Sequence, residues 1–184
     1  KGFEGPRSVM VPNCSFPYMV KHIERNGFKK KLDLFQYRST IPNKVPEVYS
    51  NIAERVLKRG FKVLEFQKSK EIRPYVKTVF DLINETYTDI YGFAPLQEIE
   101  SKEFSERFLP LLDPKYIKLI ADKNDKIVAF VIAMPDISEG FKKANGKLFP
   151  FGFIHILRAF KKATQLNLLL GCVQGSIRNS GLDA

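Results

Sequence analysis

The sequence contains few of the residues that build metal centres, disulfide frameworks or catalytic thiol–imidazole pairs. Its 184 residues include only two cysteines and two histidines. Because Cys14 and Cys172 are far apart and too few for a disulfide framework, we expect a reducing compartment, the cytoplasm. His22 and His155 show no metal-ligand spacing with the cysteines. We therefore expect no metal site, zinc included, and no Cys–His nucleophile pair.

Long hydrophobic runs are also absent. No apolar run approaches the roughly 20 residues that a membrane span requires, so we expect no membrane partner. The basic residues Lys1 and Arg7 are not followed by the apolar segment of a secretory signal. The first residue is not Met, and we expect the native start to lie upstream.

The composition is that of an ordinary globular protein, with 44% hydrophobic and 27% charged residues. The length suits one domain, or one domain and part of another. A formal net charge of +10 suits an anionic partner such as nucleic acid, acidic lipid or a phosphorylated cofactor. Nucleic acid is disfavoured, because the lysines are scattered and no nucleic-acid-binding motif is present.

One stretch, residues 165–184, has the pattern of a binding site. An apolar run from Leu166 to Val173 is consistent with a strand buried on both faces, although a buried helix has the same pattern. A loop rich in Gly and Ser follows, and its unhindered N–H groups could hold an anion. Arg178 could add bidentate contacts to a phosphate. A simple turn after a strand is the competing interpretation.

The preceding segments alternate between helix and strand. We expect a helix and then a strand within residues 15–39, the strand covering Leu32–Tyr37, and a helix between Pro46 and Lys58. A strand at 62–67, a long helix from Ser69 to about Ile90, and a second helix capped by Ser101 come next. Two β-rich runs, 116–122 and 127–134, flank a polar turn and predict a hairpin. Short helices are expected at 137–144 and from Gly152 to about residue 163.

This order of elements resembles the first two-thirds of a GNAT-superfamily acyltransferase lobe. The resemblance implies an α+β fold with a mixed, mostly antiparallel sheet and flanking helices. In that family the loop after the fourth strand has the pattern Arg/Gln-x-x-Gly-x-Gly/Ala and wraps the pyrophosphate of acetyl-CoA. Arg178 and Gly181 match this pattern, whereas Asp183 stands where Gly or Ala is usual.

Several short pieces together resemble a family of long bacterial proteins with two GNAT-like lobes. The pieces are Gly2–Pro6, Asn26–Lys30, Tyr91–Pro95, Met134–Asp136 and Asn145–Leu148. The resemblance implies that residues 1–41 close one lobe, 42–60 connect, and 61–184 open a second lobe that is incomplete at its C-terminus. We hypothesise that residues 15–39 supply the helix and strand that this second lobe lacks.

The resemblance further implies transfer of an acetyl or other acyl group from acyl-CoA to an amine of unknown identity. The cofactor-binding residues would be those at the end of the last strand and in the following loop: Cys172, Val173, Gln174, Arg178, Asn179, Ser180 and Gly181. Gly171 is either a bulge that admits the cofactor or a site of close packing. No catalytic residue is assigned. Asp136 and Glu65 are weak candidates for a general base, with Asp122 and Glu139 behind them, and Asp136 could instead cap the helix that follows it.

Three functions remain open on the sequence. The first is an acyl-CoA-dependent N-acyltransferase, and the second is a catalytically silent GNAT-like module that binds a ligand or partner. The third, a basic nucleic-acid-binding protein, is favoured by charge alone. The acceptor substrate and the oligomeric state are not encoded in any motif of this chain.

Overall fold

The computed structural model describes residues 16–182 of the chain. These residues belong to two compact units, Lys1–Lys44 and Val45–Ala184. Cys14, Ser15, Asp183 and the Gly2–Pro6 piece lie outside the described residues.

In its described part, residues 16–44, the first unit contains one helix, α1 (Pro17–Arg25), which ends at Asn26. Gly27 follows with a φ of +84°, so it provides the predicted glycine stop. The predicted strand at Leu32–Tyr37 is wrong, because no helix or strand forms between residues 28 and 44. Leu34 and Tyr37 are 85% and 93% exposed. A lone extended segment gains no ladder hydrogen bonds, and this segment belongs to no strand of the described sheet.

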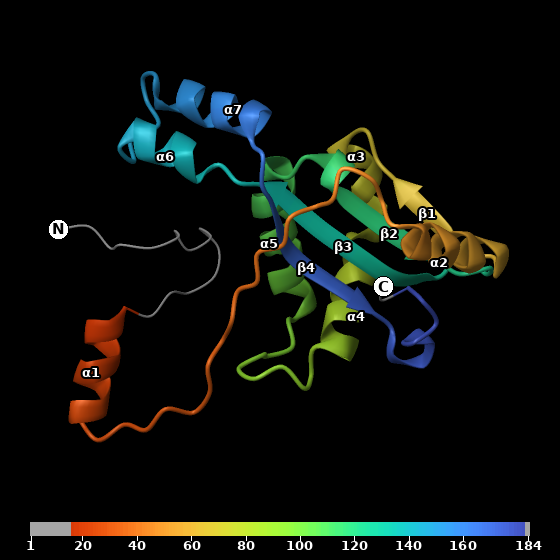
Figure 1. The fold of residues 1–184 in the computed structure, drawn as a ribbon, viewed down its shortest axis with the longest axis horizontal. Coiled ribbons are helices and arrows are strands. Elements are labelled where there is room, and N and C mark those ends of the chain that lie inside the picture. Colours follow the sequence, from red (N-terminus) through yellow and green to blue (C-terminus); the bar gives the residue numbers. More distant parts are fainter. Residues whose placement is uncertain (1–15, 183–184) are drawn as a thin grey trace. The chain divides into compact units, whose positions relative to one another are not determined.

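The second unit contains the remaining helices and all the described strands (Figure 1). The helices are α2 (Glu47–Lys58), α3 (Ser69–Ile72), α4 (Val76–Thr86), α5 (Glu98–Phe108), α6 (Ser138–Ala144) and α7 (Gly152–Lys162). The strands are β1 (Lys62–Glu65), β2 (Ile117–Ala121), β3 (Ile127–Pro135) and β4 (Leu166–Val173). Single 3-10 turns occupy Arg73–Tyr75, Leu109–Leu111, Pro114–Tyr116 and Gly175–Ile177.

The four strands form one antiparallel sheet in the order β1-β2-β3-β4. The β2–β3 hairpin lies where the sequence predicts it, around a turn in which Asp122 accepts hydrogen bonds from the N–H groups of Asn124 and Lys126. With helices flanking the sheet, the fold is α+β with an antiparallel sheet, as predicted, and it is consistent with the mixed fold of GNAT-like proteins.

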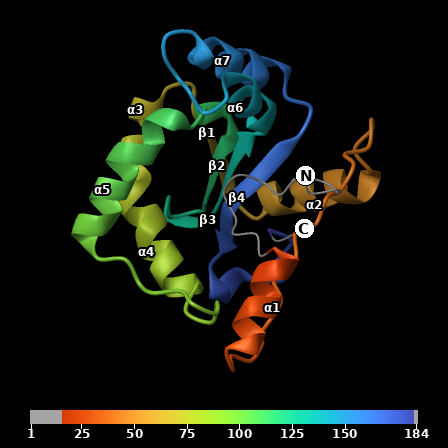
Figure 2. The same cartoon turned by 90° about the vertical axis from the view of Figure 1, so that its left-hand side faces the viewer.

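The core lies between the sheet and the α4–α5 layer, which covers one face of the sheet (Figure 2). Side chains of a strand alternate between the two faces, so register places Leu119, Phe130 and Cys172 on the α4 side. Leu119 is fully buried, and Leu82 and Ile83 of α4 pack in the same cluster. The apolar face of α4 therefore forms the core together with the sheet.

Two helix boundaries differ from the prediction. The helix expected from Ser69 is broken into α3, a 3-10 turn and α4, because Pro74 lacks the N–H that a continuous helix needs at that position. Ser101 does not cap the second helix. The N–H of Gln97 is instead bonded by Glu100, and Ser101 is buried inside α5, where its hydroxyl donates to the Gln97 carbonyl.

Strand β4 is not buried on both faces as its composition predicts. Asn167 is its one buried residue, and Leu168 is 74% exposed. The strand is the last in the sheet order, so its outer edge carries no neighbouring strand within the described sheet. That open edge positions the candidate site.

Candidate functional site

The site is built on the outer edge of β4, which is interrupted by a register shift. Ile132 pairs with Leu170, whereas its neighbour Ala133 pairs with Leu168, so Leu169 is an extra residue on the β4 side. The sequence suggests Gly171 as a possible bulge, but Gly171 pairs regularly with Val131. A bulge bends its strand and redirects the groups that follow it. The backbone from Gly171 onward is therefore redirected at an open edge.

Tyr87, directly after α4, reaches this edge with its hydroxyl group. The hydroxyl donates to the Gly171 carbonyl at 3.0 Å and accepts from the Gly171 N–H at 3.2 Å. The N–H and C=O of one strand residue point to the same side, so both outward groups of Gly171 are satisfied by one phenol. Burial raises the pKa of Tyr87 above its ordinary value of 10.0. The phenol therefore keeps its proton at neutral pH.

Further polar side chains gather at the end of β4. The Gln174 amide donates to the Glu85 carboxylate at 3.0 Å, and Arg178 Nε donates to the Val173 carbonyl at 3.3 Å. Burial raises the pKa of Cys172, with the Thr86 hydroxyl and the charge of Arg178 opposing the rise. Cys172 is therefore a protonated thiol at neutral pH and not an activated nucleophile.

The loop after β4 folds back against α2. Asn179 and Gly181 have φ angles of +63° and +97°, so this small-residue segment turns sharply. Arg59 donates to the Ser180 carbonyl at 3.0 Å. A Cβ on Gly181 would lie 3.1 Å from the Ile52 side chain, so glycine also permits the close approach of α2. Ser180 Oγ is buried without a hydrogen-bond partner among the described residues, an observation that suits a ligand at this loop.

A basic pocket of about 400 Å³ lies beside this loop. Its basic side chains are Arg59 after α2 and Lys123 and Lys126 in the β2–β3 turn, and Gln174 and Ser176 belong to its wall. Among the described residues, the one acidic side chain in its lining is Asp122, whose carboxylate already accepts backbone hydrogen bonds within the turn. Three basic groups against one engaged carboxylate make this pocket suited to an anion.

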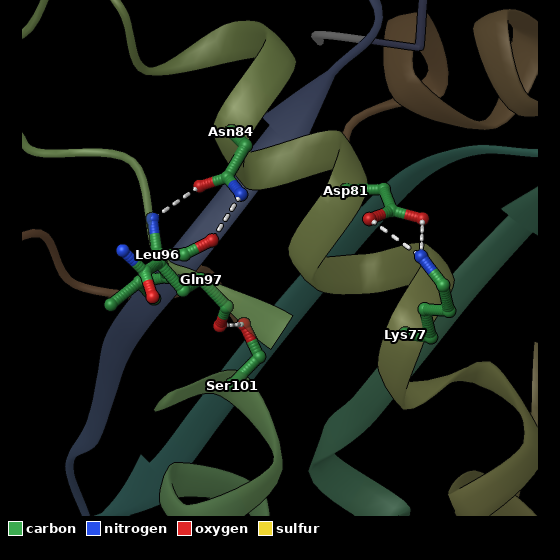
Figure 3. A network of polar contacts seen from close by, with 6 residues as sticks. All are labelled: Lys77, Asp81, Asn84, Leu96, Gln97 and Ser101. Atoms are coloured by element: carbon green, nitrogen blue, oxygen red, sulfur yellow. Dashed lines mark hydrogen bonds and ion pairs between the residues drawn. The ribbon is translucent and has the colours of Figure 1, made fainter. Parts of the chain in front are cut away.

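A larger hollow, of about 610 Å³, lies between α4 and α5. Figure 3 shows its polar lining, in which the Asn84 amide bonds both the N–H and the carbonyl of Leu96, at 2.9 and 2.8 Å. Lys77 pairs with Asp81 at 3.1 Å in the same hollow. These groups satisfy one another, and the lining mixes both charge signs. The Asn84–Leu96 hydrogen bonds hold the loop before α5 against α4. The smaller basic pocket is therefore the better candidate for an anionic ligand.

The structure gathers the residues predicted for cofactor binding at one end of β4 and its loop. It does not bring the weak catalytic candidates Glu65 and Asp136 there. Glu65 lies on β1, at the opposite edge of the sheet, and pairs with Lys118 at 2.7 Å. Asp136 adjoins the start of β4, where its N–H bonds the Gln165 carbonyl, roughly 20 Å along the strand from Cys172. Its carboxylate accepts from the Ser138 N–H at the beginning of α6.

Sequence reasoning missed several residues of this site: Arg59, Glu85, Tyr87, Lys123 and Lys126. Most lie in turns or at helix ends far along the chain from residues 172–181, so no local spacing connects them. Tyr87 falls within the long helix that the sequence predicts from Ser69 to about Ile90, and its ring packs against the core. The Tyr87 hydroxyl is the feature of the sequence that could have indicated the site, because a half-buried phenol at the end of a helix needs a polar partner.

Two other kinds of functional element are absent from residues 16–182. No group of three or more His, Cys, Asp or Glu side chains is placed to hold a metal ion in that part of the chain. None of its helices is both long and apolar enough to cross a bilayer.

The chain is similar to two curated bacterial proteins. It is 24% identical over 160 residues to the bacterial ceramide synthase of Caulobacter vibrioides, covering 87% of this chain and 41% of that protein. It is 26% identical over 166 residues to protein YghO of Escherichia coli, covering 88% of this chain and 40% of that protein. The chain thus spans about two-fifths of the length of these relatives. No family model matches the sequence.

Proposed function

We propose that this chain is part of an acyltransferase that moves an acyl group from acyl-CoA to the nitrogen of an amine. The observation that carries the proposal is the open, bulged edge of β4, which ends beside a small-residue loop and a basic pocket. An extended ligand with amide groups can pair with such an edge, as an added strand does. The phosphates of the same ligand would then lie near the basic pocket.

The residues present fit an acyl-CoA at this place. Arg59, Lys123 and Lys126 would meet its phosphates, with Arg178 near the end of the strand. The unpartnered Ser180 Oγ would gain a hydrogen-bond partner. The thioester of the bound molecule would supply the acyl group. The protein would contribute position and hydrogen bonds, which are large terms in transfer between two bound reactants.

Tyr87 is the residue we assign to hydrogen-bond donation at the reacting end. Its hydroxyl is hydrogen-bonded to the outward C=O and N–H groups of Gly171, and its raised pKa keeps the hydroxyl protonated. A ligand that replaced the Gly171 carbonyl as acceptor would receive the hydrogen bond that the Tyr87 hydroxyl donates. Neither Glu65 nor Asp136 is near it, so we propose no general base from the residues described.

The similarity to a protein named bacterial ceramide synthase supports both the reaction class and an acceptor class. A ceramide is the N-acyl derivative of a long-chain amino alcohol. We therefore propose a long-chain amine as the acceptor, and the GNAT resemblance of the sequence supports an acyl-CoA donor. Because fold and function are separable, binding and turnover require separate tests.

The binding test is calorimetric and thermal-shift titration of the chain with acetyl-CoA and a long-chain acyl-CoA. We expect saturable binding that Arg178→Ala and Lys123→Ala/Lys126→Ala weaken by about tenfold. Arg107→Ala, which removes an exposed arginine on α5, is the matched control and should leave affinity unchanged. Absence of binding at millimolar acyl-CoA would remove the support for a donor site.

The turnover test is mass spectrometric detection of the N-acyl product with a long-chain amine. Product that depends on Tyr87 and Arg178 supports the proposal. Binding without product, in the chain and in a longer form that includes the rest of the relatives' length, favours a ligand-binding module instead. Salt-sensitive binding to random duplex DNA without acyl-CoA binding would favour a nucleic-acid-binding protein.

A further inference from the structure

The connection between β3 and β4 is a helical hairpin made of α6 and α7, which projects beyond the end of these strands (Figure 1). Two glycines fix its geometry. A Cβ on Gly140 would lie 2.8 Å from the Ile156 Cα, so the two helices cross in close contact. A Cβ on Gly152 would overlap the Lys147 carbonyl oxygen, so the turn between the helices tolerates only glycine there. The hairpin is therefore a tightly built element with a defined tip.

The tip, residues 147–153, exposes large apolar side chains. Phe149 and Phe151 are 82% and 70% exposed, and Leu148 and Phe153 are also exposed. The ring centroids of Phe149 and Phe153 are 6.4 Å apart, so the apolar surface is continuous. A contiguous exposed apolar patch of this kind marks an interaction site.

Basic residues flank the tip and continue along α7 to its base. Residues 142–162 contain six basic side chains and no Asp or Glu, and all six are exposed: Lys142, Lys143, Lys147, Arg158, Lys161 and Lys162. On α7, Phe153, Leu157 and Lys161 are spaced by four, which places them on one helix face. All three are exposed, so this face changes from aromatic at the tip to cationic at the base.

We propose that the tip of the α6–α7 hairpin inserts into the surface of an anionic lipid bilayer. The aromatic rings would enter the boundary between headgroups and acyl chains, and the basic side chains would meet the lipid phosphates. The charged side chains of residues 142–162 are all basic and are adjacent to apolar surface. An anionic bilayer complements both properties, with negative charge outside and hydrocarbon within.

This proposal does not depend on the proposed acyltransferase function. It does depart from the sequence-based expectation of no membrane partner, which considered only spanning segments. Surface binding of this kind requires no span.

The first test uses the fact that the chain contains no tryptophan. Phe149→Trp places a single fluorescent reporter at the tip, and Tyr91→Trp, at a site 65% exposed, is the matched control. With vesicles of phosphatidylglycerol and phosphatidylcholine, the indole emission of the Phe149→Trp variant should shift to shorter wavelength, and that of the Tyr91→Trp variant should not. With phosphatidylcholine alone the shift should be much smaller, and added salt should reduce it.

The second test measures vesicle partitioning by sedimentation. Phe149→Ser/Phe151→Ser should lower the partition coefficient by about tenfold or more, because two apolar insertions are lost. Ile99→Ser/Leu111→Ser removes two comparably exposed apolar side chains from outside the hairpin and should have little effect.

A charge comparison completes the second test. Lys161→Gln/Lys162→Gln should weaken binding more than Lys29→Gln/Lys31→Gln, although both pairs lower the net charge equally. Circular dichroism verifies that every variant is folded.

Three results would overturn the proposal. One is no binding of the folded chain to anionic vesicles. Another is equal partitioning of the tip variant and its control. The third is a short-wavelength emission of the Phe149→Trp variant without lipid, which would mean that another part of the protein or a second copy covers the tip.

Discussion

At the scale of single residues, Tyr87 joins the helix layer to the strand edge. Its ring packs in the core and lies edge-on to Phe93 with centroids 5.7 Å apart. Its hydroxyl satisfies both outward groups of Gly171. One side chain thus contributes apolar burial to the fold and a proton donor to the candidate site.

Tyr87→Phe should lower the free energy of unfolding by about 1 kcal/mol, because two hydrogen bonds are lost while the ring is kept.

The wild-type protein should also lose stability as pH rises above 10.0. The folded pKa of Tyr87 is raised, so the unfolded chain releases this proton first, and the stabilisation present below pH 10.0 decreases as pH approaches the folded value. Urea denaturation between pH 8 and 11 measures both effects. The Tyr87→Phe variant should lack the part of the stability loss above pH 10.0 that comes from this phenol. The control variant Tyr91→Phe should behave as wild type.

Cys172 should be a slow nucleophile. Burial raises its pKa above the ordinary value of 9.0, so the thiolate that reacts with alkylating agents forms only at higher pH. In a Cys14→Ser background, the rate of alkylation by iodoacetamide should rise with a midpoint above pH 9.0. A midpoint at or below that value would contradict the placement of this thiol. Acyl-CoA should slow the reaction if the ligand covers the end of β4.

At the scale of elements, the α6–α7 hairpin depends on glycine at its tip. Gly152→Ala should destabilise the hairpin by about 1–3 kcal/mol, because the new Cβ overlaps the Lys147 carbonyl. Hydrogen exchange of residues 138–163 should accelerate accordingly. Gly175→Ala is the matched control, since a Cβ there meets nothing within 4 Å. Unchanged exchange in Gly152→Ala would mean that the tip adopts another conformation.

Elements with strong local patterns were predictable from the sequence. The β2–β3 hairpin, α6 and α7 form near their predicted positions, because alternation, turn residues and helical spacing act over a few residues. The segment Leu32–Tyr37 has a strand-like composition but no strand partner in the described sheet, and partners are a nonlocal property. The exposure of β4 was missed for the same reason, because a composition cannot show that a strand lies at an edge.

The site was predictable only where it is contiguous. Residues 172–181 run without a break from the end of β4 into the loop after it, so the sequence could group them. Arg59, after α2, bonds Ser180 in that loop, and Tyr87, after α4, bonds Gly171 of β4. Their approach depends on how helices pack on the sheet, which no motif of this chain encodes.

At the scale of the whole molecule, the sheet and its core belong to one of the two units. Every buried residue of the core cluster lies between Phe66 and Phe130, inside Val45–Ala184. A fragment of residues 45–184 should therefore unfold cooperatively, with a Tm within a few degrees of the full chain. Circular dichroism melting and amide NMR spectra of both forms measure this. Loss of dispersed strand resonances in the fragment would show that the first unit is needed for the fold.

The base of the α6–α7 hairpin has a consequence for evolution and engineering. Pro135 pairs with Leu166, and the Asp136 N–H bonds the Gln165 carbonyl at 2.9 Å. The chain therefore leaves the sheet and returns to it at adjacent points, as it does in a tight turn. An insertion closed in this way can be lengthened, exchanged or removed with little change in strand register. The hairpin is thus a module that related chains could vary independently of the strand edge at the other end of β4.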